Sequence, residues 1–216
     1  MNTGWKSKLF DLAAATPMVV LLSFEIGWAL LQISQTPDRM ESALTISSKL
    51  ADVAFSGLLI LLFVVRRQPV RKAHGLLPRA AALAGLLLPA IIVALPRANL
   101  SLAMSILSSG IILIGTVASI VTAFWLGRSF SILPQARSLV TGGPYRFVRH
   151  PLYLAELMIA FGGLLEFEPP WSLLVMLVIV GVQLPRMHFE EKVLTQAFPS
   201  YREYAGRTAR LVPGLY

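Results

Sequence analysis

Long apolar runs divide the first part of the chain and predict helices that cross a membrane. Residues 12–33 and 100–126 are mainly apolar, and a helix needs about 20 such residues to span a hydrocarbon core about 30 Å thick. Residues 46–65 and 76–95 reach this length if a polar residue near one end is tolerated. We therefore expect four membrane segments before residue 127.

Two shorter apolar runs predict a helical hairpin after these segments. Residues 152–165 and 171–184 are joined by Glu-Phe-Glu-Pro-Pro at 166–170, a sequence typical of a tight turn. Pro185 ends the second run, and the remaining chain is polar and amphipathic, which predicts a short cytoplasmic helix near the C-terminus. The predicted fold class is an all-α polytopic transmembrane helix bundle of five to six segments, with residues 1–216 as one domain.

Composition agrees with a membrane protein and excludes several kinds of site. Hydrophobic residues make up 56% of the chain and charged residues 14%, against roughly 25% charged in a typical soluble domain. The first apolar run is longer than the core of a signal peptide, about 7 to 15 residues, so we expect a membrane segment there. The chain has no cysteine, which excludes disulfides and thiolate chemistry. Its three histidines are too scattered for a zinc motif, so no metal is expected.

The distribution of basic residues predicts which side of the membrane each loop occupies. Sixteen of the 19 Lys and Arg residues fall on one side of the predicted segments, leaving Arg39, Lys49 and Arg97 for the other. Because short cytoplasmic loops are enriched in Lys and Arg, we expect both termini in the cytoplasm, with the chain in a bacterial inner membrane or its equivalent. The net charge of +8 then reflects topology and attraction to anionic headgroups. We expect no nucleic-acid partner.

Acidic residues within the apolar runs are candidates for function, because ionisable groups there cost at least about 2.5 kcal/mol. Glu25 lies in the middle of the first run and is either a proton or cation site or a packing contact with a neighbouring helix. Asp52 lies near the outer end of the second run, where it reaches water. Glu156 lies one turn into the hairpin, near a basic loop, which makes it the better candidate for a polar pocket.

Polar residues gather at both ends of the hairpin. Residues 142–153 read Gly-Gly-Pro-Tyr-Arg-Phe-Val-Arg-His-Pro-Leu-Tyr, and residues 186–191 read Arg-Met-His-Phe-Glu-Glu. Pro151 suits the first turn of a helix, and His150 and Tyr153 share one face of its start. Arg186 and Glu190 are four apart and also share a face. Since both arms of a hairpin return to the same side, we expect one pocket at the cytoplasmic interface.

Each of these residues also has an ordinary structural interpretation. Arg149 and His150 can anchor headgroups, and Tyr145 and Tyr153 can belong to an interfacial aromatic belt. Arg186 and Glu190 can form a helix salt bridge worth about 0.3 to 0.5 kcal/mol (their spacing is i, i+4). Their convergence at the two ends of one hairpin favours a site.

The order and spacing of these residues resemble the isoprenylcysteine carboxyl methyltransferase family. The pattern is Gly-Pro-Tyr at 143–145, Arg-His-Pro-x-Tyr at 149–153, Arg-x-x-x-Glu-Glu at 186–191, Leu194, Phe198 and Tyr-x-x-Tyr at 201–204. Members of the family are membrane enzymes that use S-adenosylmethionine and are related to phospholipid N-methyltransferases. The resemblance covers roughly residues 127–216. Ala155 replaces a common glycine, and residues 198–201 are one residue shorter than the usual spacing, but neither departure removes a polar group.

The resemblance implies roles for particular residues. It implies a cofactor-binding and catalytic region at 127–216 on a membrane scaffold at 1–126, with a lipophilic or lipid-modified acceptor and membrane lipids as partners. It places Arg186 against the methyl acceptor, and the implied catalytic residues are Arg149, Arg186 and Glu190. The implied S-adenosylmethionine site consists of Arg137, Ser138, Leu139, Val140, Tyr145, His150, Pro151, Leu152, Tyr153 and Glu190.

For methyl transfer, the main task of the protein is to align the methyl donor with the acceptor. Such alignment can lower the activation barrier by about 7 to 11 kcal/mol. The ring faces of Tyr145 or Tyr153 can attract a sulfonium cation by about 0.5 to 2 kcal/mol. A carboxylate acceptor oriented by Arg186 is already ionised and predicts a flat pH profile near neutrality. An amine must lose a proton and needs a base such as His150, His188 or Glu191, which predicts a steep profile.

Two other classes of protein fit parts of the sequence. Membrane sterol-type reductases resemble this family in their C-terminal half and bind NADPH. Its phosphates can be bound by Arg137, Arg146 and Arg149. A non-catalytic transporter or scaffold is favoured if Glu25 proves essential while Arg186 and Glu190 can be changed freely. Cofactor binding distinguishes the three.

Overall fold

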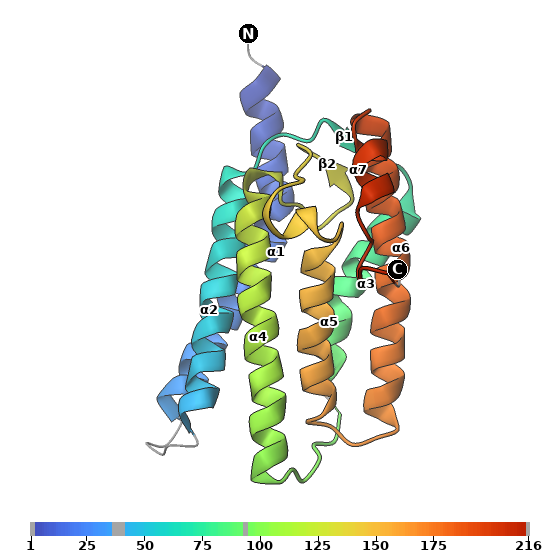
Figure 1. Ribbon diagram of the computed structural model, residues 1–216. Helices are drawn as coiled ribbons and strands as arrows, with labels where there is room; N and C mark the ends of the chain where they lie inside the picture. The colour runs from blue at the N-terminus through green and yellow to red at the C-terminus, as the bar shows by residue number, and fades with distance from the viewer. Residues whose placement is uncertain (1–2, 36–41, 93–94, 215–216) are drawn as a thin grey trace.

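The computed structural model describes residues 3–35, 42–92 and 95–214, and nearly all of its regular structure is helical (Figure 1). The helices are α1 (Thr3–Gln35), α2 (Ser42–Val65), α3 (Leu76–Ile92), α4 (Leu102–Leu126), α5 (Pro151–Leu164), α6 (Trp171–Ala197) and α7 (Tyr201–Arg207). The short elements are the 3-10 helices η1 (Gly127–Ser129) and η2 (Gly143–Arg146) and the strands β1 (Arg71–Lys72) and β2 (Gln135–Ala136). The all-α prediction is confirmed.

Four of the described helices are long and apolar enough to cross a membrane. These spans are Ala15–Gln35, Ile46–Val65, Leu102–Ser129 and Trp171–Ala197. Two shorter apolar helices, Leu76–Gly85 within α3 and Pro151–Leu164, run alongside them in the bundle. The protein is therefore an integral membrane protein with a polytopic bundle. The fifth and sixth predicted segments form the expected hairpin of α5 and α6.

Helix packing depends on small residues, as is common in lipid. α1 packs on α2, α2 on α4, α4 closely along α5, and α6 on both α5 and α3. A Cβ atom at Gly115 of α4 would lie 2.8 Å from the Ile159 side chain, and one at Gly162 of α5 would lie 2.7 Å from that of Ile112. Ser108 donates a hydrogen bond to the Gly162 carbonyl over 3.0 Å. α5 is thus held tightly against the scaffold.

Two connecting loops join at one end of the bundle. β1 pairs antiparallel with β2, with Arg71 opposite Ala136 and Lys72 opposite Gln135. Figure 1 shows the N-terminus, both strands and α7 at this end. Lys49 and Arg97, two of the three basic residues expected elsewhere, lie toward the other end, while Arg39 is outside the described residues. The predicted segregation of basic residues thus agrees with the fold.

Pro185 ends the apolar run but not the helix. α6 continues from Trp171 to Ala197 with Pro185 inside it. A proline removes one intrahelical hydrogen bond, and membrane helices tolerate this where neighbouring groups satisfy the freed carbonyl. The residues from Arg186 to Glu191 therefore lie on the part of α6 that continues beyond its apolar run. The predicted segment 76–95 is helical to Ile92, and residues 93–94 lie outside the described residues.

Candidate functional site

Glu191 is bound by three basic side chains from two separate parts of the chain. His150 Nε2 lies 3.0 Å from Glu191 Oε1, and Arg149 Nη1 lies 3.1 Å from the same oxygen. Arg210 donates to both oxygens, with Nε at 3.0 Å and Nη2 at 2.7 Å. The carboxylate is 12% exposed, so it is well shielded from water. This cluster ties the start of α5 and the C-terminal segment to α6.

The C-terminal segment reaches the cluster because it pairs with the residues before α5. Val148 and Ala209 form a parallel bridge, and the His150 amide donates to the Arg210 carbonyl over 3.1 Å. From α7, the Tyr204 hydroxyl donates to the Tyr145 carbonyl over 2.5 Å. The chain therefore closes over the 142–153 region after leaving the hairpin.

The two ends of the hairpin meet at Tyr153 and Glu190. The Tyr153 hydroxyl donates to Glu190 Oε2 over 3.0 Å. α5 begins at Pro151 with His150 at its N-cap position, and the rings of His150 and Tyr153 lie 5.3 Å apart on the shared face. The proximity predicted from the hairpin is confirmed. Glu190 itself is about one-third exposed, so this carboxylate, unlike Glu191, remains accessible.

A small cavity of about 40 Å³ lies beside Glu190. Its lining contains seven of the predicted site residues, namely Arg137, Ser138, Leu139, Val140, Tyr145, Arg149 and Glu190, together with residues such as Leu126, Ser129, Leu194, Tyr201 and Tyr204. The structure thus brings the 137–140 segment, η2, α6 and α7 around one space.

The remaining predicted cofactor residues lie outside this lining. Pro151 is buried where it begins α5. Leu152 packs with the core cluster that includes Phe63 and Phe130 and borders a different space. The imidazole of His150 is 4% exposed and is bound to Glu191. Pro151, Leu152 and His150 therefore do not line the cavity beside Glu190.

Phenol groups around the cavity are held neutral. Burial raises the pKa of the Tyr145 hydroxyl above its usual value, and the nearby Glu190 raises it further. Burial likewise raises the pKa of Tyr204 to about 12, against the opposing effect of Arg149. The fixed charges that a ligand would meet here are therefore the carboxylate of Glu190 and the guanidinium groups.

Arg186 belongs to a second polar cluster deeper in the bundle. Its Nη1 donates to Gln183 Oε1 over 2.7 Å and lies 3.3 Å from Glu156 Oε2. Gln183 Nε2 donates to the same Glu156 oxygen over 2.9 Å. Among the described residues Arg186 pairs with Glu156 and forms no ion pair with Glu190, so the interpretation as a simple i, i+4 salt bridge is wrong. Glu156 takes part in a polar pocket, as its position suggested.

Arg186 is also packed against aromatic and backbone surfaces. Its guanidinium carbon lies 4.7 Å from the centroid of the Tyr153 ring, so one ring face that we expected to meet a sulfonium is covered by this cation. On the other side, a Cβ atom at Gly85 of α3 would lie 2.6 Å from Arg186 Cδ. Gly85 therefore provides the space in which the Arg186 side chain lies.

A groove of about 520 Å³ runs along the bundle beside this cluster. Apolar side chains from α1, α2, α5 and α6 form most of it, and its polar residues include Glu25, Glu156, Gln183 and Arg186. Glu25, for which the sequence suggested no partner, accepts a hydrogen bond from Ser56 over 3.5 Å. A narrow space lined by Tyr153, Arg186 and Glu190 lies between the groove and the cavity.

Two contributors were missed by sequence reasoning. Gln183 could have been found, because it lies three residues before Arg186 on the same helix face. Arg210 gave no such signal, since it reaches Glu191 only through the pairing of residues 148–150 with 209–210.

Two comparisons with known proteins match parts of this chain. Within the described residues, no group of three or more His, Asp or Glu side chains could hold a metal ion. A stretch of 83 residues is 34% identical to the cobalt-zinc-cadmium resistance protein CzcN of Cupriavidus metallidurans, covering 36% of this chain and 37% of that protein. The match thus spans little more than a third of this relative. A protein-family model matches residues 97–200. The matching model is that of the phospholipid methyltransferase family, the family of the isoprenylcysteine carboxyl methyltransferase-like proteins, and the matched residues hold α4, the hairpin and most of the cavity lining.

Proposed function

We propose that this protein is an S-adenosylmethionine-dependent methyltransferase that acts on a lipophilic or amphipathic acceptor in the membrane. The observation that carries the proposal is the Tyr153–Glu190 hydrogen bond of 3.0 Å, because this pair lies between a polar cavity and a groove among the membrane helices. The match of residues 97–200 to the phospholipid methyltransferase family supports methyl transfer as the reaction.

The residues at the cavity fit the chemistry of the cofactor. Glu190 suits the amino group or hydroxyls of the cofactor as a charge-assisted acceptor, Arg149 suits its carboxylate, and Leu139 and Val140 offer apolar surface to its base. When bound, S-adenosylmethionine supplies an activated methyl group. The cavity volume of about 40 Å³ is far below the roughly 300 to 1,000 Å³ of small-molecule pockets. Binding therefore requires the cavity walls to move apart.

The chain's own residues align the reactants. Glu190 is fixed by the phenol of Tyr153, and Glu191 holds Arg149 against the cavity. Arg186 faces the groove, and its Nε is buried with no hydrogen-bond partner among the described residues. A donor left unpaired in this way costs free energy unless a ligand completes it. Arg186 thus has one N–H group available for an acceptor.

The acceptor proposed to fit best is one that needs no base. His150 and Glu191, two of the candidate bases, are already bound to each other across 3.0 Å, and His188 is exposed on the outer side of α6. A carboxylate acceptor is ionised at neutral pH and can be oriented by Arg186. It would give a flat pH profile near neutrality, whereas an amine acceptor would give a steep one.

The proposed orientation places the cavity end of the bundle in the cytoplasm. Basic residues collect at this end, as expected for the inner side of a bacterial inner membrane. On this proposal residues 127–216 carry the cofactor site and catalytic residues, and residues 1–126 form the membrane scaffold. Water-soluble cofactor then reaches the cavity from the cytoplasm, while the acceptor reaches the groove from the lipid.

Calorimetric titration of the purified chain in detergent tests the proposal. We expect saturable binding of S-adenosylmethionine, a loss of about tenfold or more in Glu190→Gln, and unchanged affinity in Lys192→Gln, because Lys192 is exposed on the same helix. Arg186→Gln should retain cofactor binding and lose methyl transfer to a panel of lipid carboxylates and amines.

Two results would replace the proposal. Saturable binding of NADPH with none of S-adenosylmethionine would indicate a reductase. Binding of neither, with Glu25 essential for a cellular phenotype and Glu190 dispensable, would indicate a transporter or scaffold.

A further inference from the structure

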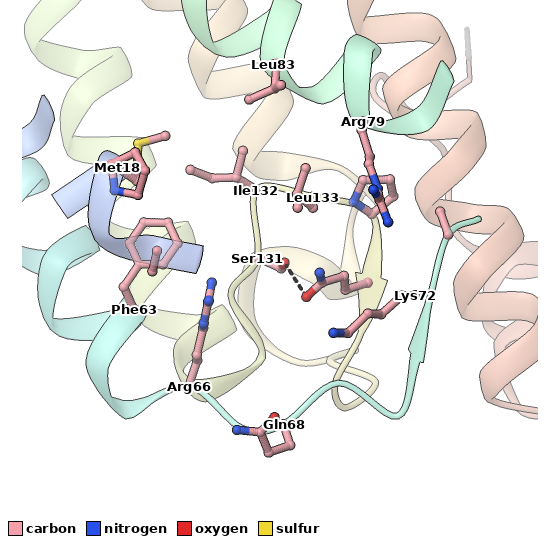
Figure 2. A pocket seen from close by; sticks show the side chains of 15 residues that line it. Met18, Phe63, Arg66, Gln68, Lys72, Arg79, Leu83, Ser131, Ile132 and Leu133 are labelled. Atoms are coloured by element: carbon pink, nitrogen blue, oxygen red, sulfur yellow. Dashed lines mark hydrogen bonds between the residues drawn. The ribbon is translucent and has the colours of Figure 1, made fainter. Parts of the chain in front are cut away.

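A further space of about 670 Å³ lies outside the cavity beside Glu190. Figure 2 shows it between the middle of α1, the end of α2 and the start of α3, with the loop after α2 on one side and the 131–135 segment on another. Neither the proposed reaction nor the family pattern assigns it a ligand. We call it the basic chamber.

Three cations line the basic chamber. Arg66, Lys72 and Arg79 face it, and none of the described residues that line it is acidic. Arg66 lies over the Phe63 ring, with its guanidinium carbon 4.8 Å from the centroid. Figure 2 shows Arg66 and Lys72 approaching from the loop side and Arg79 from α3. Positive charge concentrated in a concave site raises the local concentration of anions.

Two of these cations, Lys72 and Arg79, are not neutralised by a described neighbour. Neither Lys72 nor Arg79 has a carboxylate partner among the described residues. Gln135, which lines the same wall, accepts hydrogen bonds from Ser131 over 3.3 Å and from Arg137 over 2.8 Å. Its carbonyl oxygen is therefore already used and does not offset the charge. The fixed register of Lys72 opposite Gln135 holds the lysine at the rim.

The opposite side of the chamber is apolar and leads into the membrane. Met18, Phe63, Leu83, Ile132 and Leu133 form this side. Met18 and Ile132 also border the groove among the membrane helices, so the chamber and the groove adjoin. A ligand with an anionic head and a hydrocarbon tail would place the head at the three cations and the tail along the groove.

We propose that the basic chamber binds the phosphate headgroup of an acidic lipid, whose acyl chain follows Met18 and Ile132 into the groove. The proposal does not depend on methyl transfer, since binding can be measured without cofactor. The wall at residues 131–134 also borders the narrow space lined by Tyr153, Arg186 and Glu190. Residues 131–134 therefore separate a bound headgroup from the candidate active site.

The test is native mass spectrometry of the full chain in neutral detergent, titrated with phosphatidylglycerol or phosphatidylcholine. We expect retained phosphatidylglycerol and much weaker phosphatidylcholine binding. The double variant Lys72→Gln, Arg79→Gln should lose about twenty-fivefold in phosphatidylglycerol affinity, since each basic group contributes about fivefold near an anionic surface. The matched control Lys192→Gln, Arg202→Gln removes the same charge at exposed sites outside the chamber and should change affinity by less than about threefold.

A competition experiment distinguishes binding of a lipid from binding of a free anion. Inorganic phosphate at millimolar concentration should not displace phosphatidylglycerol from the wild-type chain, because the tail contributes to binding. Displacement by phosphate alone, equal affinity for the two lipids, or equal losses in the double variant and its control would each overturn the proposal. Thermal melting in neutral detergent shows whether the double variant is folded, and Leu83→Asn, which changes only the apolar side, gives an independent variant expected to weaken lipid binding.

Discussion

The hydroxyl of Tyr153 on α5 donates to Glu190 Oε2 on α6 across 3.0 Å, linking the two arms of the hairpin where they leave the apolar region. The same tyrosine ring carries the Arg186 guanidinium 4.7 Å from its centroid. One side chain thus contacts both a carboxylate at the small polar cavity and a cation at the membrane groove. The hydroxyl of Tyr153 makes the first contact and its ring makes the second, so substitutions can remove one contact and keep the other.

Tyr153→Phe should weaken cofactor binding while preserving the fold. The variant keeps the ring under Arg186 but removes the hydrogen bond to Glu190. Loss of a bond to a charged group costs about 1.5 to 3 kcal/mol, so we expect S-adenosylmethionine affinity to fall by about tenfold or more in calorimetric titration. Unchanged affinity, with Glu190→Gln also unchanged, would show that Glu190 does not contact the cofactor.

Glu191→Ala should destabilise the protein more than it affects the chemistry directly. It leaves Arg149, His150 and Arg210 without their shared carboxylate. Removing one partner of a shielded charge cluster costs about 3 kcal/mol. Denaturant unfolding in detergent measures the loss, and Glu203→Ala, which removes an exposed carboxylate on α7, is the control. A difference below about 1 kcal/mol between the two variants would contradict the role of Glu191.

Gly85→Ala should impair use of the acceptor without affecting the cofactor. The added Cβ atom would lie 2.6 Å from Arg186 Cδ, so the arginine must move from its place against Tyr153 and Glu156. Displacement of a positioning group by about 1 Å can cost about a hundredfold in rate, so we expect kcat/KM for the acceptor to fall by about ten- to a hundredfold. Gly181→Ala is the matched control, since its Cβ atom would meet nothing within 4 Å. Equal activity in both variants would contradict the positioning of Arg186 by Gly85.

Tyr204→Phe should change how stability depends on alkaline pH. Because burial raises the pKa of Tyr204 to about 12 in the folded chain, above the value of about 10 for a free phenol, the neutral phenol stabilises the fold fully below pH 10. That stability is lost as pH rises from 10 through 12. The variant should lose about 1 kcal/mol at pH 7, for its bond to Tyr145, and should show a shallower fall in melting temperature between pH 10 and 12. If melting temperature falls equally with pH in the wild-type chain and the variant, the pKa of Tyr204 is not raised in the folded chain.

Much of the fold follows from local sequence. The apolar runs predicted the helices to within a few residues at several ends, because the length of an apolar stretch reflects the thickness of the bilayer. The hairpin turn at 166–170 and the start of α5 at Pro151 were also predictable, since turn residues and an N-terminal proline act locally. The continuation of α6 through Pro185 was not, because tolerance of a proline depends on neighbouring helices.

By itself, the sequence determined that this is a polytopic membrane helix bundle and that Tyr153 and Glu190 return to the same end of one hairpin, because hydropathy and the period of a helix are properties of short stretches of chain. Three other features appear only in the folded chain: Arg186 pairs with Glu156 in the space left by Gly85, Arg210 joins the Glu191 cluster, and Arg66, Lys72 and Arg79 line one chamber. These contacts join residues far apart in the chain, so they depend on which helices pack together and on how the loops pair, which no local pattern specifies.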